Sequence, residues 1–359
     1  MPTIAQDEVL GLDQAWPMPG RPRPIVVVGA GGIVRDAHLP AYAKAGFEVA
    51  GLYDIDRGRA EALAGRFGIA RAYPDLDAAL AERDAVFDLA LPPEAVLETV
   101  GRLPEGATVL IQKPLGRDLA EARRIVEVCR RRRLTAAVNF QLRFSPMMLA
   151  VRDAIAKGML GEITDLDVRL TLRQPWELWP FMARLEAVEV IMHSIHYLDW
   201  IRSVLGEPAS VYARSVGHPD HPTLADARTS TILDYGDRVR CSLALNHTWK
   251  HGGPFQEAGV RIDGRRGAAY VKLGLLLNYP VGEPEELHLV TEGVGWTRVP
   301  LVGRWFPDAF VGVMANLQRF AAGEDSELHT AVEDAARTMA VVDACWRSSR
   351  GGGTVITEP

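Results

Sequence analysis

Five short runs of apolar, mostly β-branched residues alternate with amphipathic stretches between residues 25 and 138, and this alternation constrains the fold most. Short continuous apolar runs predict strands buried on both faces, and the stretches between them predict helices. Right-handed crossovers then give a doubly wound parallel sheet that binds ligands at the carboxyl ends of its strands. The predicted strands are 25–28, 47–53, 85–91, 107–111 and 134–138, and the predicted helices are 57–67, 76–82, 93–102 and 118–132.

The pattern of the chain changes after about residue 144. Residues 164–173 alternate apolar and polar side chains, which predicts a strand with one buried face. Turn residues such as Tyr235-Gly236-Asp237 separate several later strand candidates, so we expect a largely antiparallel, open sheet covered by helices on one face. The later strand candidates are 209–216, 228–235, 238–247, 258–263, 268–273 and 286–291, and the helix candidates are 146–157, 187–204, 309–321 and 327–347.

The length of the chain predicts two domains. Its 359 residues exceed the size of about 250–300 residues at which a single core usually stops growing. We predict an α/β domain over residues 24–143 and an α+β domain over residues 144–359 that binds the substrate and forms the oligomer contact. The first 24 residues hold five prolines and lack the basic and apolar regions of a signal peptide, so we predict an extended leader over residues 1–23.

The charge balance excludes two classes of partner. The chain has 40 basic and 46 acidic residues and a net charge of −6, which gives no general attraction for nucleic acid or an anionic membrane. No segment approaches the run of about 18 apolar residues that a membrane span needs. The cysteines, Cys129, Cys241 and Cys345, are far apart and odd in number, so we predict no disulfide framework and a cytoplasmic location.

The first predicted strand runs into a glycine-rich turn, Gly29-Ala30-Gly31-Gly32-Ile33-Val34. In the G-x-G-x-x-G fingerprint, glycine permits the tight turn and lets the backbone approach a pyrophosphate, while the next helix offers unpaired N–H groups. Gly29 and Gly31 fill the first two places, and Val34 occupies the third, where a small residue normally lies. We therefore predict a Rossmann domain in which this variant fingerprint binds the pyrophosphate of a dinucleotide.

An acidic residue ends the second predicted strand. Asp54 is placed to accept hydrogen bonds from the adenosine ribose hydroxyls, and it would repel a 2′-phosphate. Asp54 therefore favours NAD as the cofactor. Arg57 and Arg59 follow closely and could accommodate a 2′-phosphate, so NADP remains an alternative. A structural turn with a surface aspartate is the alternative without function.

Four motifs together resemble the Gfo/Idh/MocA family of glucose-fructose oxidoreductase-like and inositol dehydrogenase-like enzymes. They are the strand–glycine–helix start, Leu91-Pro92-Pro93, Gln112-Lys113-Pro114 and Asn139-Phe140-Gln141-Leu142-Arg143-Phe144. The resemblance covers about residues 24–359. It implies an enzyme that uses NAD(P) to oxidise or reduce a secondary alcohol of a sugar or cyclitol, with Leu91, Pro92, Gln112 and Lys113 at the cofactor.

The family's E-K-P motif matches Gln112-Lys113-Pro114. The resemblance implies that Lys113 reaches both the nicotinamide and the substrate oxygen, where its ammonium would stabilise developing alkoxide charge. Gln112 replaces the family's glutamate and removes a carboxylate partner of Lys113, which leaves the protonation state of this lysine open. A solvated lysine after a strand is the alternative interpretation.

The family's second catalytic motif, D-x-x-x-H, matches a stretch that departs from it. His196 takes the histidine place, but Met192 stands where the aspartate is expected. Glu189, His193 and His196 are spaced i, i+4 and i+7, which places them on one face of a helix. We hypothesise that His196 is the general base, that His193 holds a neighbouring substrate hydroxyl, and that Glu189 orients His193. Hydrogen-bonded interior histidines are the alternative.

Three further assignments stay open at this point. Arg143 is a candidate substrate ligand or the partner of an acid, and Trp176 in the stretch 176–181 is a candidate pocket wall or packing residue. His193 and His196 could bind zinc together with His247 and His251. We predict no metal site, because no cysteine or carboxylate spacing supports a closed one.

The motifs together predict hydride transfer between nicotinamide and a secondary alcohol of a sugar, polyol or sugar derivative, with Lys113 and His196 as the catalytic pair. A redox-assisted lyase or glycosidase that regenerates its NAD in each turnover is one alternative. A non-catalytic dinucleotide-binding module is the other. The open sheet would expose a broad apolar face, so we expect a homo-oligomer, a dimer or tetramer, as in similar enzymes.

Overall fold

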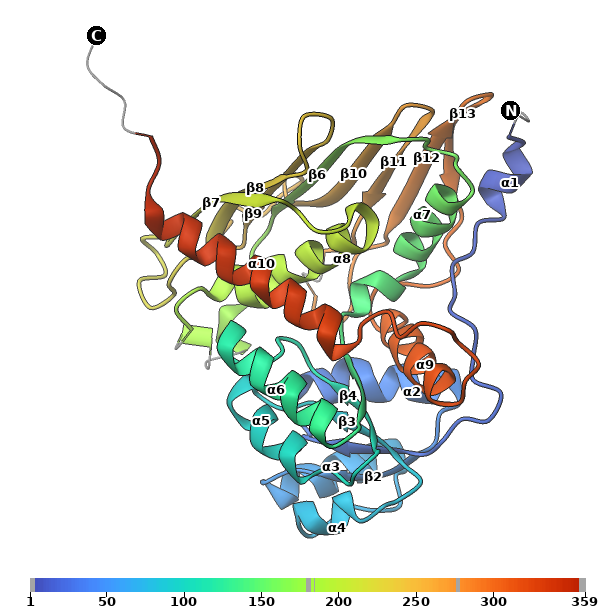
Figure 1. The fold of residues 1–359 in the computed structure, drawn as a ribbon, viewed down its shortest axis with the longest axis vertical. Helices are drawn as coiled ribbons and strands as arrows, with labels where there is room; N and C mark the ends of the chain where they lie inside the picture. Colours follow the sequence, from blue (N-terminus) through green and yellow to red (C-terminus); the bar gives the residue numbers. More distant parts are fainter. Residues whose placement is uncertain (1–3, 179–181, 184, 276–277, 355–359) are drawn as a thin grey trace. The chain divides into compact units, whose positions relative to one another are not determined.

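The computed structural model describes residues 4–178, 182–183, 185–275 and 278–354 (Figure 1). The chain forms two compact units, each assembled from separate segments. The parallel-sheet unit comprises Asp13–Ala150 and Val302–Met339, and the mixed-sheet unit comprises residues 1–12, 151–301 and 340–359. The division predicted from sequence, with boundaries after residues 23 and 143, stays a prediction. No helix among the described residues is long and apolar enough to cross a membrane.

The parallel-sheet unit contains the five strands that the alternation predicts. All neighbouring strands are parallel, in the order β2-β1-β3-β4-β5. The crossovers leave β1 in opposite directions, so β1 and β3 flank the point where the strand order reverses, and ligands bind at such switch points. The strands are β1 (Ile25–Val28), β2 (Val49–Tyr53), β3 (Val86–Leu89), β4 (Thr108–Ile111) and β5 (Thr135–Val138).

Helices cover this sheet, and side-chain caps begin three of them. Asp56, Asp75 and Asp118 accept hydrogen bonds from backbone N–H groups in the first turns of α3, α4 and α6. In Figure 1, α5 and α6 run side by side. The helices are α2 (Leu39–Ala45), α3 (Arg57–Phe67), α4 (Leu76–Leu80), α5 (Pro93–Arg102), α6 (Leu119–Arg131) and α9 (Ala309–Ala321), with a π-helix η1 (Val34–His38) and a 3₁₀ helix η2 (Gln141–Phe144).

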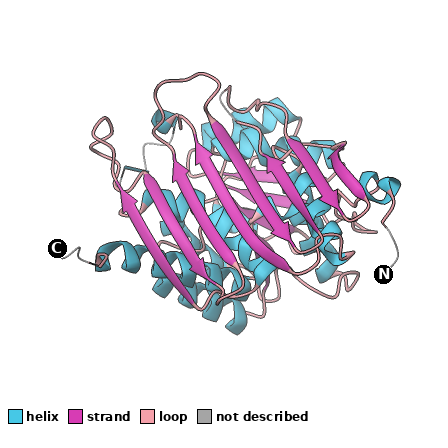
Figure 2. Cartoon of the chain, turned by 90° about the horizontal axis from the view of Figure 1, so that it is seen from above, coloured by secondary structure: helices cyan, strands magenta, loops and turns pink. Residues whose placement is uncertain are grey.

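The mixed-sheet unit contains an eight-stranded sheet, seen face-on in Figure 2. Its order is β13-β12-β11-β10-β6-β9-β8-β7, and every neighbouring pair is antiparallel except β6 and β9. This confirms the predicted fold class. The strands are β6 (Ile163–Thr171), β7 (Ser210–Val216), β8 (Arg228–Asp234), β9 (Arg240–Asn246), β10 (Glu257–Gly264), β11 (Gly267–Lys272), β12 (Glu286–Thr291) and β13 (Val294–Val299).

The helical segments of this unit differ in part from the prediction. The predicted helix 187–204 is a π-helix followed by the α-helix α8, and residues 6–10 of the predicted extended leader form the short helix α1. The side chain of Val9 in α1 is buried, and α1 contacts β13, which explains the helix. The segments are α1 (Gln6–Leu10), η3 (Trp176–Leu178), η5 (Val190–Ser194) and α8 (Ile195–Leu205); α7 (Pro146–Ala156) and α10 (Val332–Gly351) carry residues of both units.

Candidate functional site

The glycine turn follows β1 at the switch point of the parallel sheet. Gly29 has φ of 107°, and a Cβ added there would lie 2.4 Å from the carbonyl oxygen of Ala90, just after β3. Only glycine fits this close approach without a shift of the backbone. A Cβ added at Gly31 meets no described atom within 4 Å. The turn therefore presents backbone to open space, as a pyrophosphate cradle requires.

The helix after the glycine turn begins as the π-helix η1 rather than as the expected α-helix. Val34, which takes the third glycine place of the fingerprint, is fully buried in the core of the parallel-sheet unit. Gly32 is exposed and Ile33 is half-buried, so they lie on the outer side of the turn. The departure at Val34 therefore fills core volume and leaves the open face of the turn unobstructed.

The carboxylate of Asp54 lies directly after β2 and contacts the glycine turn. Its Oδ2 accepts a hydrogen bond from the N–H of Ala30 at 2.7 Å, and its Oδ1 accepts one from the N–H of Asp56 at 2.9 Å. Each oxygen retains a lone pair for a ribose hydroxyl. Nη1 of Arg59 lies 4.0 Å from Oδ1, and Arg57 is paired with Glu61. Two backbone hydrogen bonds therefore fix the carboxylate of Asp54 beside the glycine turn.

Lys113 and Gln112 follow β4 at the carboxyl edge of the sheet. The side-chain oxygen of Gln112 accepts the backbone N–H of Lys113 at 3.0 Å. Burial lowers the pKa of the Lys113 amine to about 8, because the surrounding protein removes water that would stabilise the ammonium. A lysine with such a pKa exchanges its proton near neutral pH, which suits it to acid–base chemistry.

A buried polar network that the sequence analysis did not predict crosses the same unit. Asp88 lies in β3 and is fully buried; its Oδ2 lies 2.6 Å from Nδ1 of His38 and accepts a hydrogen bond from the hydroxyl of Tyr42 at 2.8 Å. Nε2 of His38 lies 3.3 Å from the side-chain nitrogen of Asn139. Burial and the Asp88 carboxylate raise the pKa of Tyr42. The network ties η1 and α2 to β3, next to the glycine turn.

The remaining candidate of this unit, Arg143, is paired with an acid. Its guanidinium donates to the carboxylate of Asp334 at 2.6 Å and to the carbonyl oxygen of His329 at 2.8 Å, and only 10% of its side chain is exposed. Of the two predicted alternatives, the structure shows the ion pair. A contact of Arg143 with substrate stays a prediction.

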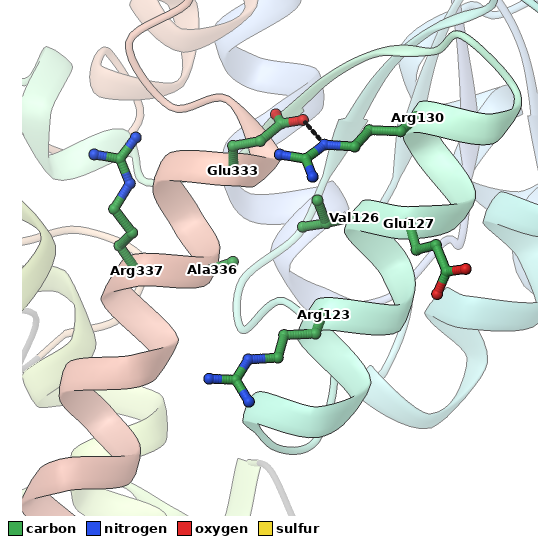
Figure 3. Close-up of a pocket in the computed structure, with 7 residues that line it drawn as sticks. All are labelled: Arg123, Val126, Glu127, Arg130, Glu333, Ala336 and Arg337. Atoms are coloured by element: carbon green, nitrogen blue, oxygen red, sulfur yellow. Dashed lines mark hydrogen bonds and ion pairs between the residues drawn. The ribbon is translucent and has the colours of Figure 1, made fainter.

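A separate pocket lies between α6 and the start of α10 (Figure 3). Arg130 forms an ion pair with Glu333 in it, at 2.9 Å. None of the candidate site residues lines this pocket, and its charged side chains are typical of a solvated helix surface. It is lined by Arg123, Val126, Glu127, Arg130, Glu333, Ala336 and Arg337.

In the mixed-sheet unit, two parallel strands bring polar and aromatic residues to one edge. β6 leads to Trp176, and β9 leads directly to His247. Because β6 and β9 are parallel neighbours, their carboxyl ends meet, and the backbone N–H of Gln174 donates to the carbonyl oxygen of His247 at 3.1 Å. The rings of Trp176 and His247 are 6.1 Å apart, in an edge-to-face arrangement. The rest of the aromatic stretch, 179–181, lies outside the described residues.

Glu189, His193 and His247 form a cluster beside Trp176. The carboxylate of Glu189 is fully buried and accepts a bifurcated hydrogen bond from the single O–H of Ser194, whose Oγ lies 2.8 and 3.0 Å from the two carboxylate oxygens. Oε1 of Glu189 lies 3.3 Å from Nε2 of His247. The rings of His193 and His247 stack with centroids 4.0 Å apart. The predicted neighbours Glu189 and His193 are thus together, and the structure adds His247 and Ser194.

His196 is the second residue of α8 and is 92% buried. The group of ligand atoms that lie within 4.8 Å of one another comprises Glu189, His193 and His247. The shared face predicted for Glu189, His193 and His196 stays a prediction. The π-helix η5 has a wider turn than an α-helix, so the regular i, i+4, i+7 spacing does not apply across it. π-helical turns are frequent at functional sites.

Comparison with known families assigns the chain. A model described as an oxidoreductase family with an NAD-binding Rossmann fold matches residues 23–140, and the model of the Gfo/Idh/MocA C-terminal domain matches residues 148–270. The protein belongs to the Gfo/Idh/MocA family. It is an oxidoreductase with an NAD-binding Rossmann fold, as the glycine turn and Asp54 indicate.

Relatives in the Gfo/Idh/MocA family match over most of the chain. D-apiose dehydrogenase of Paraburkholderia graminis is 27% identical over 347 residues, covering 92% of this chain and 88% of that protein. Inositol 2-dehydrogenase of Rhizobium meliloti is 26% identical over 339 residues, covering 90% and 95%. The structure of levoglucosan dehydrogenase with NADH and levoglucosan has a TM-score of 0.77 at 18% identity, covers 92% of this chain and 98% of its own, and shows the shared fold.

This member departs from the catalytic motifs of the Gfo/Idh/MocA family at Gln112 and Met192, and the structure shows what each of these residues contacts or fills. Gln112 keeps a hydrogen bond to the Lys113 backbone in place of the family's charged partner. Met192, in the aspartate place, is buried, and the acid next to the histidines is Glu189. The sequence signal for His247 was its position at the end of a predicted strand, and the signal for Asp88 was a charge inside an apolar strand.

Proposed function

We propose that this protein is a dehydrogenase or reductase that transfers hydride between NAD(H) and a secondary alcohol of a sugar, polyol or sugar derivative. The substrates in the names of its relatives, D-apiose and inositol, are polyhydroxylated and support this class. NADP(H) is the alternative cofactor, favoured by Arg59 and disfavoured by the carboxylate of Asp54, which is held by two backbone N–H groups. NAD(H) is therefore the proposed cofactor.

The residues that would hold the cofactor lie at one edge of the parallel sheet. The turn from Gly29 to Val34 would receive the pyrophosphate at its open backbone, and Asp54 would receive the ribose hydroxyls. Leu91 lies against the turn, since a Cβ on Gly29 would be 3.6 Å from its side chain. Pro92, Gln112 and Lys113 follow β3 and β4 at the same edge.

The observation that carries the proposal is that Lys113 follows β4 at the same carboxyl edge of the sheet as the open glycine turn and Asp54. Burial there lowers the pKa of the Lys113 amine to about 8. When bound, the nicotinamide supplies the hydride acceptor for an alcohol carbon. The Lys113 ammonium would stabilise the negative charge that develops on the alcohol oxygen as its proton leaves. A group with a pKa near 8 also exchanges a proton with water readily after turnover.

Further residues are assigned roles toward the substrate. We propose that His196 accepts the proton of the reacting substrate hydroxyl and that His193 forms a hydrogen bond with a neighbouring substrate hydroxyl. Trp176 would form the pocket wall against which the face of the sugar packs. Glu189 would orient the histidines, with which its buried carboxylate is clustered. In the parallel-sheet unit, we assign to Arg143 a contact with the substrate in addition to its ion pair with Asp334.

A substrate screen tests the proposal. NAD⁺ would be incubated with pentoses, hexoses, inositols and glycosides, and NADH formation followed by absorbance. We expect NADH to accumulate with at least one class of substrate. Lys113→Met should lower kcat by about 10²–10⁴-fold, the usual contribution of a positioned proton-transfer group to the rate. The matched control Lys157→Met, at an exposed lysine paired with Asp153, should keep the full rate.

Two outcomes would contradict the proposal. Consumption of a substrate without net NADH would indicate redox-assisted elimination or glycoside cleavage instead. Binding of NAD⁺ without turnover of any polyhydroxylated compound, and without exchange of the nicotinamide C4 hydrogen, would indicate a non-catalytic binding module.

We further propose a homo-oligomer, a dimer or tetramer, that forms through the open face of the eight-stranded sheet. Tyr212 and Ile232 are directly opposite each other on β7 and β8 and are 64% and 53% exposed. The same row of cross-strand neighbours continues to Tyr270 on β11, which is also exposed. Trp296 on β13 is 61% exposed. Burial of these exposed aromatic and aliphatic side chains against a second copy of the chain would remove apolar surface from water and stabilise the oligomer.

We also propose a cytoplasmic location. All three cysteines are free and buried, and burial raises the pKa of each thiol to about 12. These thiols are unreactive structural side chains, which suits a reducing compartment. Recovery of the protein in the cytoplasmic fraction with three titratable thiols after unfolding is the expected result.

A further inference from the structure

We propose that Glu189, His193 and His247 form a binding site for one divalent transition-metal ion, with zinc as the best fit. One ligand atom from each of these residues lies within 4.8 Å of the other two. Two imidazoles and one carboxylate are the ligand set of several catalytic zinc sites, which keep a fourth position open. Of the four histidines that could bind zinc by their positions in the sequence, His193 and His247 belong to this cluster, and Glu189 completes it.

The distance between Glu189 and His247 fits ligands of a shared ion. Oε1 of Glu189 and Nε2 of His247 are 3.3 Å apart, yet Nε2 of His247 makes no hydrogen bond within the described part of the chain. Bonds of about 2.0–2.1 Å to a tetrahedral metal place two ligand atoms about 3.3–3.4 Å apart. The separation therefore matches an edge of a zinc tetrahedron.

The buried negative charge of Glu189 also favours a bound cation. The Glu189 carboxylate is fully buried, and no lysine or arginine among the described residues pairs with it. A buried carboxylate without a compensating charge is costly. A divalent metal ion bound between Glu189 and the two stacked imidazoles would compensate the charge of the carboxylate.

The surroundings of the cluster resemble the supporting groups of a metal site. The Ser194 hydroxyl donates to both oxygens of Glu189 and fixes the plane of the carboxylate. Trp176 is 92% buried, lies edge-on to both imidazoles, and its Nε1 finds no hydrogen-bond acceptor among the residues described. A water or hydroxyl oxygen on the fourth metal position would give this N–H an acceptor.

The open position would lie on the side of His193, which is half-buried while Glu189 and His247 are buried. In that position the ion would bind a substrate hydroxyl, the role assigned above to the His193 ring. This role rests on the proposed function, whereas metal binding by itself does not. A test with the metal alone therefore separates a failure of the site from a failure of the oxidoreductase proposal.

The test uses the full chain without a polyhistidine tag, stripped with a chelator and dialysed. Zn²⁺ is titrated in competition with a chromophoric chelator, and the bound metal is counted by mass spectrometry. We expect one Zn²⁺ per chain, and a Co²⁺-substituted protein with the visible absorption of a tetrahedral site. Glu189→Gln and His247→Ala should each weaken Zn²⁺ binding by at least about 100-fold.

His251→Ala is the matched control, because His251 is exposed, follows the same strand as His247 and packs against Trp249. It should bind Zn²⁺ as the wild type does. If circular dichroism shows that Glu189→Gln or His247→Ala does not fold, the test rests on His193→Ala, because His193 is only half-buried. This variant should bind Zn²⁺ more weakly than the wild type. Absence of tight binding of Zn²⁺, Co²⁺, Mn²⁺ and Fe²⁺ by the wild type, full binding by His193→Ala, or loss of binding in His251→Ala would overturn the proposal.

Discussion

Lys113 is the residue whose chemistry depends most on its surroundings. Its amine would be fully charged in water at neutral pH, but burial lowers its pKa to about 8. The charged form, which would stabilise the developing alkoxide, is therefore present below about pH 8 and is lost as the pH rises through that value. An arginine at the same place would stay charged throughout the accessible range.

The pH dependence of catalysis should follow the titration of Lys113. In the wild type, kcat/KM for the alcohol reaction should fall on the alkaline side with an apparent pKa near 8, because Lys113 loses its proton. In Lys113→Arg this decline should move to higher pH, at a lower maximal rate because the guanidinium is larger. Steady-state rates between pH 6 and 10 check both. An unchanged alkaline decline in Lys113→Arg would show that another group titrates.

Asp54 acts on the glycine turn and would act on the ribose. Asp54→Ser removes the charge that opposes a 2′-phosphate, while Arg59 remains nearby. We expect the KM for NAD⁺ to rise by about 10-fold or more and activity with NADP⁺ to appear, measured as the ratio of kcat/KM for the two cofactors. Asp56→Ser, which keeps a capping side chain at the start of α3, should leave that ratio unchanged. A preference for NAD⁺ retained in Asp54→Ser contradicts the assignment.

At the scale of the element, sequence periodicity predicted most helices and strands but not their irregular turns. α3 and α5 have the predicted bounds, because capping aspartate, proline and glycine signals mark their ends. The π-helices η1 and η5 were expected as α-helix, since side-chain periodicity does not distinguish a single wide turn. β13 was missed because its central residues are exposed, although Gly293, with φ of 87°, marks the hairpin before it.

The residues of the candidate site also differ in whether the sequence predicts their positions. Residues in a local motif, such as the glycine turn, Asp54 and Lys113, could be predicted because strand ends share one edge of a parallel sheet. The contact of Glu189 with His247 could not be predicted, because it joins residues far apart in sequence on different elements. Asp88 and His38 depend on a similar long-range pairing.

The buried network between β3 and η1 yields a stability prediction. Asp88→Leu leaves the buried donors of His38 and Tyr42 without their acceptor. Breaking a buried pair in this way should lower the free energy of unfolding by about 3–5 kcal/mol, measured by urea denaturation. Asp77→Asn removes the exposed pair with Arg102 and should leave the urea midpoint almost unchanged. Equal midpoints for Asp88→Leu and the wild type would show that the network contributes nothing.

At the scale of the whole molecule, the exposed row on the eight-stranded sheet predicts the oligomeric state. The wild type should have a multiple of the chain mass of 39.3 kDa in light scattering. Ile232→Glu should dissociate the oligomer, because a carboxylate would be buried without a partner. Val281→Glu, which replaces an exposed aliphatic residue outside the strands, should not. A monomeric wild type, or an intact Ile232→Glu oligomer, contradicts association through this face.

Binding of a nicotinamide dinucleotide at the glycine turn is tested most directly by titration with NADH, followed by nicotinamide fluorescence. Gly31→Leu should fold normally, because no described atom lies within 4 Å of the added Cβ, yet it should abolish binding by filling the space for the pyrophosphate. Gly101→Leu, at an equally open site in α5, should bind NADH as the wild type does. Equal NADH affinity in the wild type and Gly31→Leu, or no binding by the folded wild type, would contradict the account.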